Sequence, residues 1–531
     1  MKKYKNYFIN LICPAFIFGS ITGILTAVVV TLYKVCASFV ISLSEQGYQL
    51  IREHLYLIPV ALIALFGVAW VLAYLYKKHP NLKGGGIPTS IGILRGIITF
   101  RWLRNLIGTF FLSLTTFLIG VPLGNEGPSV QMGTAIGRGT VYTMAKKRRA
   151  WDRYSMTGGA CAGFSTATGA PISGIMFAIE EAHQRISPMI IIVSSVSVMF
   201  ARITSEILAP IFGVSIGLFE INSVVSLRVK DIWIPLVIGI AVGFFAVGFL
   251  KLYRVIRAFF TKTLKKVPHQ YRIFLIFVVT FVLGLLSYSF ISTGHHLIME
   301  LFEGSVALYM LLLILLVRSV LTLSASSNSI TGGMFVPILA LGALISSILG
   351  KGMVSLFGFS HEYYIIILIL GITACISSMM KTPLTAIFFA VEALSCYENI
   401  LYVIVVSAVA FVITEALGVK SINDTVVDTR VEEQNEGKTS IVIDTFVTVQ
   451  ADAFAIGKQI RDIFWPTNLF VLSLQHDPNR GAEVDEHGGK EIREGDILHV
   501  RYSTFDEAST EEELLAIVGA QKIELKEVDV I

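Results

Sequence analysis

Two ten-residue stretches decide the fold of this chain: Pro171-Ile-Ser-Gly-Ile-Met-Phe-Ala-Ile-Glu180 and Pro383-Leu-Thr-Ala-Ile-Phe-Phe-Ala-Val-Glu392. Each begins with a proline, ends with a glutamate and is apolar in between, and the two lie 212 residues apart. A glycine precedes each proline by the same 12 residues, at Gly159 and at Gly371. The chain therefore contains a repeated unit.

A second match shows that the repeat extends further towards the N-terminus of each half. Two matches in the same order, at nearly equal separations, argue against coincidence. Two halves, about 10–215 and 228–423, in which glycine and proline interrupt short helices, are typical of transporters built from inverted repeats. The second match, at a separation of 209 residues, pairs Gly124, Pro128 and Gly133 with Gly333, Pro337 and Gly342.

The composition places most of the chain in a membrane. Of its 531 residues, 54% are hydrophobic and only 15% are charged, and the mean hydropathy is +0.72. A soluble protein of this size could not cover its surface with so few charges, whereas a helix needs only about 20 apolar residues to span a bilayer. The predicted spans are 8–41, 57–74, 103–123, 190–209, 234–250, 273–290, 307–321, 364–376 and 401–417.

Charge divides the chain into two unlike parts. Residues 429–531 hold 10 Lys and Arg against 21 Asp and Glu, a net charge of −11, so the remainder carries +15. Basic clusters such as Lys146-Lys147-Arg148-Arg149 border apolar spans, which favours contact with lipid over binding of nucleic acid. By the positive-inside rule these loops face the cytoplasm. We predict a multi-pass protein of the cell membrane with both termini in the cytoplasm.

The same division predicts the domains. Residues 1–423 form an all-α transmembrane domain, the polar stretch 424–440 is read as a linker, and residues 441–531 form a small α+β cytoplasmic domain. In this last domain the predicted strands are 441–449, 469–474 and 497–502, and the predicted amphipathic helices are 452–463 and 511–518.

Three glycine–proline interruptions mark where the chemistry should lie: Gly84-Gly85-Gly86-Ile87-Pro88, Gly124-Asn125-Glu126-Gly127-Pro128 and Gly333-Met334-Phe335-Val336-Pro337. Broken helices are costly in lipid unless their free ends line a cavity. Glycine lets the backbone approach a ligand, and a helix N-terminus offers unpaired N–H groups and the positive end of the helix dipole. One such break alone favours a tight turn, but three breaks over both repeats indicate an anion site.

Three acidic residues are considered for function: Glu126 in the second break, and Glu180 and Glu181 at the end of a helix near the basic, cytoplasmic side. Glu126 stands at a helix start within apolar sequence, where an unpaired carboxylate is costly, so we interpret it as functional; the alternative is a charge satisfied by its own helix dipole. Glu180 recurs as Glu392 in the second repeat, which favours a structural role. Glu181 is matched by Ala393, and is therefore the better candidate for proton relay, although an exposed charge at a helix end fits the pattern nearly as well.

These residues resemble the CLC family of chloride channels and anion/proton antiporters over nearly all of residues 1–423. The three interruptions are similar to the family motifs GSGIP, G(K/R)EGP and GxFxP. The resemblance implies a homodimer with one anion pathway per subunit, Glu126 as an external gate that changes places with the anion and carries a proton, and Glu181 as the inner proton-transfer residue. The anion-binding residues that it implies are Gly85, Gly86, Ile87, Gly127, Met334, Phe335 and Asn423.

Three positions depart from the family pattern. Gly85 stands where the family has a serine, and Asn423 stands at about the place of its central tyrosine, so two hydroxyl groups are missing. Asn125 replaces the basic residue beside the gate. We therefore expect an altered anion selectivity and a looser coupling to protons than in typical members. Fluoride-exporting relatives fit less well, because they carry methionine at the position of Gly85.

The C-terminal domain resembles the TrkA-C (RCK-C) ligand-binding module. The segments 460–466 and 491–500 match its helix-to-strand and xxGDxLxV patterns. The resemblance implies regulation by a small ligand, such as a nucleotide, and contacts between subunits. The alternative is a dimerisation cap that only stabilises the protein.

The sequence thus favours exchange of chloride-like anions against protons, with a passive anion channel of the same fold as the main rival. A membrane enzyme or receptor is a second rival class, but we find no Ser/His/Asp set, no metal-spaced cluster and no phosphate loop. The five cysteines are scattered through apolar runs and are interpreted as packing residues. We expect no cofactor and no metal.

Overall fold

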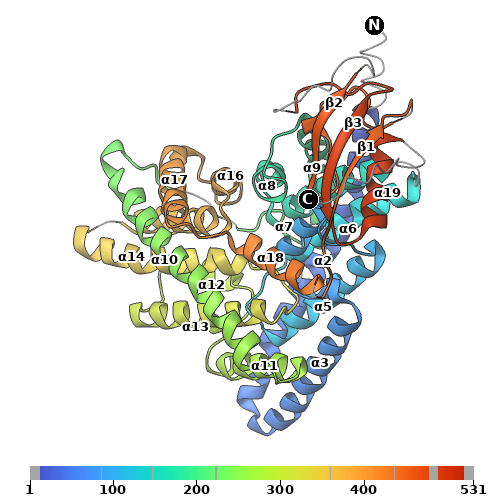
Figure 1. Cartoon of the computed structure of the whole chain (residues 1–531). Helices are drawn as coiled ribbons and strands as arrows, with labels where there is room; N and C mark the ends of the chain where they lie inside the picture. The colour runs from blue at the N-terminus through green and yellow to red at the C-terminus, as the bar shows by residue number, and fades with distance from the viewer. Residues whose placement is uncertain are drawn as a thin grey trace.

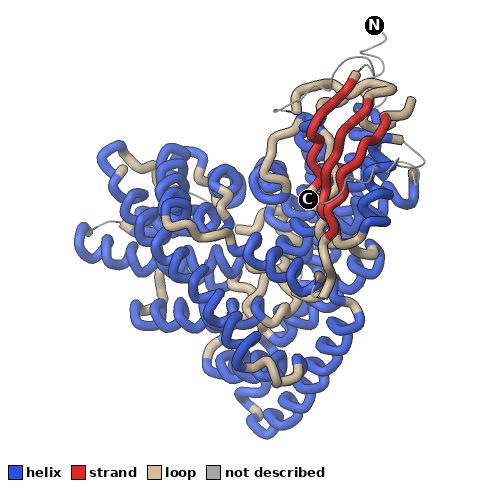
Figure 2. Tube along the Cα trace, in the orientation of Figure 1, coloured by secondary structure: helices blue, strands red, loops and turns tan. Residues whose placement is uncertain are grey.

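The molecule is mostly helical, with one small sheet at its C-terminal end (Figures 1 and 2). The computed structural model describes residues 12–84, 86–145, 149–219, 221, 224–358, 360–435, 437–451, 453–476 and 488–519. Ten of the described helices are long and apolar enough to cross a membrane. They include all nine predicted spans and one more, α14. The ten are α2 (Cys13–Glu53), α3 (Ile58–Lys78), α5 (Trp102–Ile119), α9 (Pro188–Phe212), α10 (Trp233–Ala258), α11 (His269–Leu286), α13 (Leu308–Ser327), α14 (Phe335–Phe357), α15 (His361–Cys375) and α17 (Ile400–Ala416).

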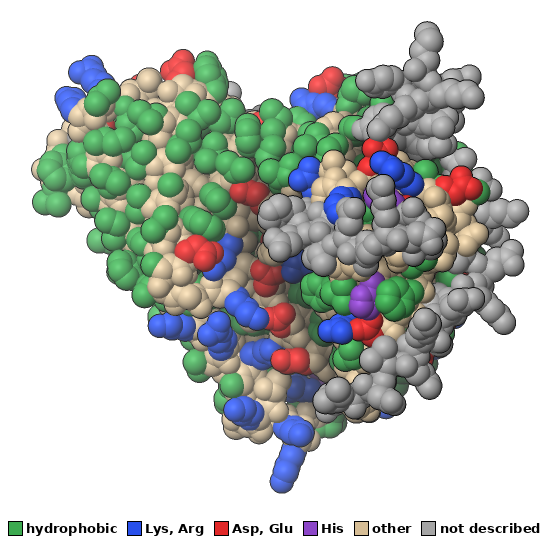
Figure 3. Space-filling model, turned by 45° about the horizontal axis from the view of Figure 1, so that its top comes forward, with side chains coloured by type: hydrophobic (Ala, Val, Ile, Leu, Met, Phe, Trp, Pro, Cys, Tyr) green, Lys and Arg blue, Asp and Glu red, His purple; other side chains and the backbone are tan. Residues whose placement is uncertain are grey.

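The outer surface of these helices is apolar, as a lipid-facing surface must be. Figure 3 shows hydrophobic side chains gathered over one broad face, whereas the charged side chains lie mainly along the lower edge and around the C-terminal domain. Large apolar residues on this surface, such as Ile211 at 68% exposure and Leu316 at 66%, would be unfavourable in water. This surface and the ten spans agree with a multi-pass membrane protein.

The two repeated stretches form a reciprocal pair of helices, α8 (Pro171–Phe177) and α16 (Pro383–Ala393). The carboxylate of Glu180 accepts hydrogen bonds from the backbone N–H groups of Leu384 (2.8 Å) and Thr385 (2.6 Å). The carboxylate of Glu392 accepts the equivalent bonds from Ile172 (2.8 Å) and Ser173 (2.9 Å). Each glutamate thus caps the start of the other helix, where free N–H groups and the helix dipole favour a negative charge.

This exchange of caps confirms the inverted repeat. Both the donors and the acceptors are related by the same shift of 212 residues, as a two-fold axis between the halves requires. It also supports the structural role that the sequence assigned to Glu180 and Glu392.

Repeated glycines bring neighbouring helices into close contact in both halves. An added Cβ on Gly133 of α6 (Glu126–Met144) would overlap the carbonyl oxygen of Gly159 on α7 (Asp152–Thr168). An added Cβ on Gly342 of α14 would lie 2.6 Å from the carbonyl oxygen of Gly371 on α15. Small residues let membrane helices approach backbone to backbone, so the repeated glycines serve the same packing role in each half.

The segment between the two domains differs from the expected linker. Helix α18 (Ile422–Gln434) occupies most of residues 424–440, so only a short connection leads to the first strand. The Ser421 hydroxyl caps this helix by accepting from the N–H of Asp424 (3.0 Å). Val426 and Val427 are buried against the membrane part. The polar composition of this segment had predicted a linker. Burial of one apolar face is enough to form a helix instead.

The C-terminal domain contains a three-stranded antiparallel sheet in the order β1-β3-β2, followed by one helix. The three strands and the last helix agree with the predicted elements, with ends that differ by a few residues. The elements are β1 (Ile441–Thr448), β2 (Leu469–Gln475), β3 (Ile497–Thr504) and α19 (Glu507–Val518).

The helix predicted for residues 452–463 is not present in the part that the structure describes. The chain turns there at Gly457, which has a φ of +74°. The N–H of Gly457 then donates to the carbonyl of Ile492, and the N–H of Ile492 donates to the carbonyl of Lys458, both at 2.9 Å. The prediction was wrong because pairing with a distant segment satisfies these backbone groups in place of helical hydrogen bonds.

Candidate functional site: three helix starts and two buried carboxylates

Three helices begin at one point inside the membrane part. An added Cβ on Gly86 would lie 2.8 Å from the Cα of Gly127, and one on Gly127 would lie 2.6 Å from the Cα of Gly333. Any side chain here would push the three starts apart, so glycine is required. The helices that begin here are α4 (Ile87–Leu94), α6 and α14.

Backbone hydrogen bonds between the two repeats hold these starts together. The backbones of Gly124 and Gly333 exchange N–H···O bonds of 2.6 and 2.8 Å. Gly84 donates to the carbonyl of Ser329 (2.5 Å) and accepts from the N–H of Gly332 (2.8 Å). The two halves are thus joined directly at the site, which keeps irregular backbone satisfied at membrane depth.

The N-termini of the three helices supply backbone N–H groups as hydrogen-bond donors, and these donors carry no full charge. The N–H groups of Ile87, Gly127 and Phe335 lie in the first turns of their helices, where no intrahelical acceptor exists. The N–H of Gly86 is used differently, because it donates to the side chain of Gln131 at 2.6 Å. An anion placed at this convergence would meet several amides and the positive ends of three helix dipoles.

The predicted anion-binding residues are mostly brought together here. Gly86, Ile87, Gly127, Met334 and Phe335 all belong to the three helix starts and are buried. Gly85 lies outside the described residues, and Asn423 is placed elsewhere. The ring of Phe335 makes edge contacts with two neighbouring rings, which fixes the start of α14; these are Phe164 at 5.1 Å and Phe389 at 5.3 Å.

Glu126 is the first residue of α6 and has 0% of its surface exposed. Among the residues that the structure describes, neither of its carboxyl oxygens has a hydrogen-bond partner. A Cβ added to Gly124 would lie 2.6 Å from Oε2, so the carboxyl group lies directly against the start of the site. A buried carboxyl group without partners is stable only when it binds a proton or faces a positive potential.

Lys34 on α2 is a cation near Glu126 that sequence reasoning missed. Its ammonium donates to the carbonyl oxygens of Ser215 (3.0 Å) and Thr166 (3.4 Å), and its charge acts on the Glu126 carboxylate. Asn125, in place of a basic residue, had suggested that no cation lies beside Glu126. The available signal was a lysine inside a long apolar span, which is costly and therefore a functional candidate.

Glu181 lies in a π-helical turn, Ala178–Ala182, that follows α8, and only 4% of its surface is exposed. Its Oε1 accepts a hydrogen bond from the side-chain amide of Asn423, whereas Oε2 has no partner among the described residues. We predicted Asn423 as an anion-binding residue; in the structure its side-chain amide contacts the Glu181 carboxylate. The structure thus brings Glu181 and Asn423 into contact, although the sequence analysis had given them different roles.

Arg430 on α18 adds a full positive charge near the start of α4. Its guanidinium donates to the Thr89 hydroxyl at 2.8 Å and to the carbonyl of Lys83, and its buried Nε has no partner among the described residues. A Cβ added to Gly84 would overlap this group, so the glycine makes room for the arginine. Arg430 was missed because it lies in the segment read as a linker.

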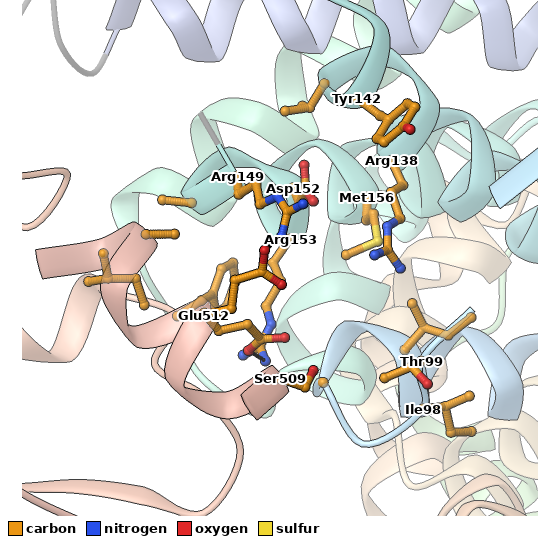
Figure 4. A pocket seen from close by; sticks show the side chains of 18 of the residues that line it. Ile98, Thr99, Arg138, Tyr142, Arg149, Asp152, Arg153, Met156, Ser509 and Glu512 are labelled. Carbon is orange, nitrogen blue, oxygen red and sulfur yellow. Dashed lines mark hydrogen bonds and ion pairs between the residues drawn. The ribbon is translucent and has the colours of Figure 1, made fainter. Parts of the chain in front are cut away.

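A cavity of about 440 Å³ is lined by residues of the membrane part and of α19 (Figure 4). Arg149 forms an ion pair with Glu512, and Arg153 forms one of 2.7 Å with Glu513. Arg138 projects from α6 on another side, where its guanidinium donates to the carbonyl of Phe100 at 2.9 Å. The cavity is therefore rich in arginine and is bounded by both domains.

Comparison with known proteins places this geometry in a family. The family model described as "Voltage gated chloride channel" matches residues 67–415. The "H(+)/Cl(-) exchange transporter ClcA" of Klebsiella pneumoniae subsp. pneumoniae is 31% identical over 394 residues, which cover 72% of this chain and 82% of that protein. The transporter of the same name from Salmonella arizonae is 29% identical over 424 residues, which cover 78% of this chain and 89% of that protein.

Solved structures share the fold. A slow cyanobacterial Cl−/H+ antiporter aligns with a TM-score of 0.71 at 24% identity, covering 80% of this chain and 99% of that one. A CLC-type fluoride/proton antiporter aligns with a TM-score of 0.62 at 22% identity, covering 76% and 96%. The inverted repeat, the joined helix starts and a family match over most of the chain lead to one conclusion: this chain belongs to the voltage-gated chloride channel (CLC) family.

Proposed function

We propose that this protein exchanges chloride-like anions for protons across the membrane. One observation carries the proposal: Glu126 is fully buried at the convergence of three helix starts, and neither of its oxygens has a hydrogen-bond partner among the described residues. Members of the family are transporters or channels and not enzymes, and the relatives from Klebsiella pneumoniae and Salmonella arizonae are named exchange transporters.

The geometry supports a simple exchange mechanism. The helix ends at Ile87, Gly127 and Phe335 attract one negative charge, which either an anion or the ionised Glu126 can supply. An arriving proton neutralises Glu126 and removes its attraction to the amides, so the anion takes its place. Glu181 exchanges protons at the other end of the pathway, with Asn423 holding one of its oxygens.

Passive conduction is the alternative function. A gradient of chloride across liposomes that contain the purified protein should drive protons against their own gradient if the two fluxes are coupled. Anion flux without such proton movement would identify a channel and contradict the proposal.

We also propose an atypical anion selectivity and loose coupling. Gly85 and Asn423 remove two hydroxyl groups that the family resemblance implies, while Arg430 adds a charge near the start of α4 and Lys34 adds one near Glu126. Selectivity depends on the number and the field strength of the groups that coordinate the ion, and these differences change both. Liposome flux with chloride, bromide, nitrate and fluoride tests this proposal; a strict chloride preference with a fixed anion-to-proton ratio would contradict it.

The assembly and orientation are further proposals. We infer a homodimer in the cell membrane, with one pathway per subunit and with both termini and the C-terminal domain in the cytoplasm. The family resemblance and the excess of basic residues in the short loops support this. Crosslinking in native membranes and a protease-accessibility assay on sealed vesicles test the two statements; a monomer, or a C-terminal domain on the outer side, would contradict them.

We propose that the cavity of Figure 4 binds a small phosphate-bearing ligand such as a nucleotide. Its volume lies within the range of about 300–1,000 Å³ that is usual for ligand pockets, and arginine suits phosphate because it can donate two parallel hydrogen bonds. The exposed Arg149–Glu512 pair is weak enough to be displaced by such a ligand.

Calorimetry with ADP on the full-length protein tests this ligand site. We expect binding that weakens about tenfold in Arg138→Gln, because one charge-assisted contact is lost, and that is unchanged in Arg254→Gln, which lies outside the cavity. Absence of binding would favour the alternative, in which the C-terminal domain is a stabilising cap.

A further inference from the structure

A short segment of the C-terminal domain, Asp462–Thr467, packs against the ends of the membrane helices; we call it the docking segment. The centroid of the Phe464 ring lies 4.4 Å from the ring centroid of Tyr154 on α7. It also lies 4.4 Å from the ring centroid of His183. The Tyr154 hydroxyl donates to the carbonyl of Asp462 at 2.7 Å. His183 directly follows the π-helical turn that carries Glu181, so the docking segment contacts the end of that turn.

The same segment is hydrogen-bonded to the turn that follows α4. The guanidinium of Arg153 donates to the carbonyl of Trp465 at 2.7 Å, and the Thr467 hydroxyl donates to the carbonyl of Arg95 at 2.6 Å. Gly96 in this turn has a φ of +76°, and a Cβ there would lie 2.8 Å from the Thr467 hydroxyl. The turn therefore has the shape that the docking segment needs.

The side chain of Arg95 extends from this turn to the two segments that carry Glu181 and Asn423. Its guanidinium donates to the carbonyl oxygens of Glu181 (2.8 Å) and Ala182 (3.0 Å). It also forms an ion pair of 2.8 Å with Asp424, the residue that follows Asn423. One guanidinium thus joins the turn that carries Glu181 to the helix that carries Asn423.

The contacts of Arg95 hold the Glu181 carboxyl group in a position where few other contacts hold it. The Glu181 carboxyl has one partner, Asn423, and its second oxygen has none among the described residues. A π-helical turn is rare and needs tertiary contacts to persist. Without Arg95, the helix end at Ala182 would lose the cation that satisfies its carbonyl oxygens.

We propose that Arg95 is a positioning residue for proton transfer at Glu181, and that the docking segment holds Arg95 in place. The C-terminal domain then acts on the proton branch of transport through its contact with Arg95, while the anion path at the three helix starts is left intact. This inference rests on the proposed exchange function.

Substitution of Arg95 tests the bridge. In liposomes with an imposed chloride gradient, Arg95→Gln should lower the proton flux about tenfold, the usual effect of losing charge-assisted hydrogen bonds, and should leave the chloride flux nearly unchanged. Arg95→Lys should restore part of the proton flux, because it keeps the charge. Arg52→Gln is the matched control, since Arg52 also donates to a main-chain carbonyl, that of Gly284, at 2.6 Å.

Substitution of Thr467 tests the role of the docking segment and covers the case in which Arg95→Gln does not assemble. Thr467→Val keeps the shape but removes the bond to the Arg95 carbonyl, so the ratio of proton flux to chloride flux should fall. Thr448→Val, at an exposed position of β1, should not change it.

The outcomes separate this inference from the proposed function. A wild-type protein that moves chloride without protons would overturn the exchange function itself. A coupled wild-type protein whose flux ratio is unchanged in Arg95→Gln and Thr467→Val would overturn the bridge alone. Equal loss of both fluxes in these variants would also overturn it, because that result indicates a general structural role.

Discussion

Glu126 shows what one buried residue can contribute to this protein. It lies where three helix dipoles offer positive potential, with Lys34 as a nearby cation, so its charged form has a place to reside. Neither of its oxygens has a hydrogen-bond partner among the described residues, whichever form it takes. Protonation removes its attraction to the helix dipoles, and the exchange that we propose depends on that loss.

Replacing Glu126 tests its proposed role as the proton carrier. We expect Glu126→Gln to abolish proton movement while chloride still passes, because the amide is neutral at every pH and cannot compete as an anion. Paired measurements of chloride and proton flux check this. Glu206→Gln, which removes a carboxylate from a pair with Arg202 on the surface of α9, should behave as the wild type. Retained proton coupling in Glu126→Gln would contradict the assignment of the gate.

The glycine contact at the site makes a second prediction at this scale. A Cβ on Gly127 would lie 2.6 Å from the Cα of Gly333 and 3.0 Å from that of Gly86, and neither backbone can move freely. Gly127→Ala should therefore separate the helix starts and lower chloride flux about tenfold or more, given the steep distance dependence of N–H contacts to an anion.

The matched control for this variant is Gly248→Ala. Gly248 lies inside α10 with nothing within 4 Å of an added Cβ, so alanine should be tolerated and is favoured in a helix by up to about 1 kcal/mol. Normal chloride flux in Gly127→Ala would show that the three starts need not touch.

Among the elements, α8 and α16 show how an inverted repeat is held together. Each is a short helix whose free N–H groups would be unsatisfied in lipid. A carboxylate from the other helix satisfies them, so neither can be placed without its counterpart. The pair explains why a proline begins and a glutamate ends both stretches.

Neutralising either cap should weaken the fold by a similar amount. Glu180→Gln and Glu392→Gln each replace a carboxylate that accepts two backbone N–H bonds, so each should lower unfolding stability by about 1–3 kcal/mol. Thermal or denaturant unfolding in detergent checks this. Because the two contacts are related by symmetry, a large effect of one substitution and none of the other would contradict the two-fold equivalence.

For the whole molecule, the contact between the two domains is built on aromatic packing. Phe464 is 8% exposed and lies between Tyr154 and His183, with the guanidinium of Arg185 4.5 Å from its ring. Removing such a ring leaves a cavity and costs about 3–5 kcal/mol.

We therefore expect Phe464→Ala to release the C-terminal domain from the membrane part. Limited proteolysis of the 435–440 connection should become faster, whereas Phe470→Ala, at a position 65% exposed on β2, should leave the rate unchanged. An unchanged rate in Phe464→Ala would show that other contacts suffice to hold the domain.

Local patterns account for much of what was predictable. The spans follow from runs of apolar residues, and the repeat follows from Pro171–Glu180 and Pro383–Glu392, because membrane helices are determined by composition over about 20 residues. The helix starts could be predicted because glycine before proline is a local signal. Glu126 could be singled out because a carboxylate is costly at that place.

The remaining features depend on contacts between distant segments. The helix over 452–463 was mispredicted because Gly457 pairs with Ile492. Asn423 meets Glu181 across 242 positions of the chain, and Arg95 reaches both the C-terminal domain and Asp424. Periodicity and propensity describe neighbours within a turn or two, so they carry no information on such pairs.

The sequence alone therefore determined that this is a membrane protein with two inverted halves, and where its helices break, because burial in lipid acts on every short segment independently. Tertiary structure decided which of those breaks meet, what holds Glu181, and how the C-terminal domain reaches it. Those features arise only when residues hundreds of positions apart are brought within hydrogen-bonding distance.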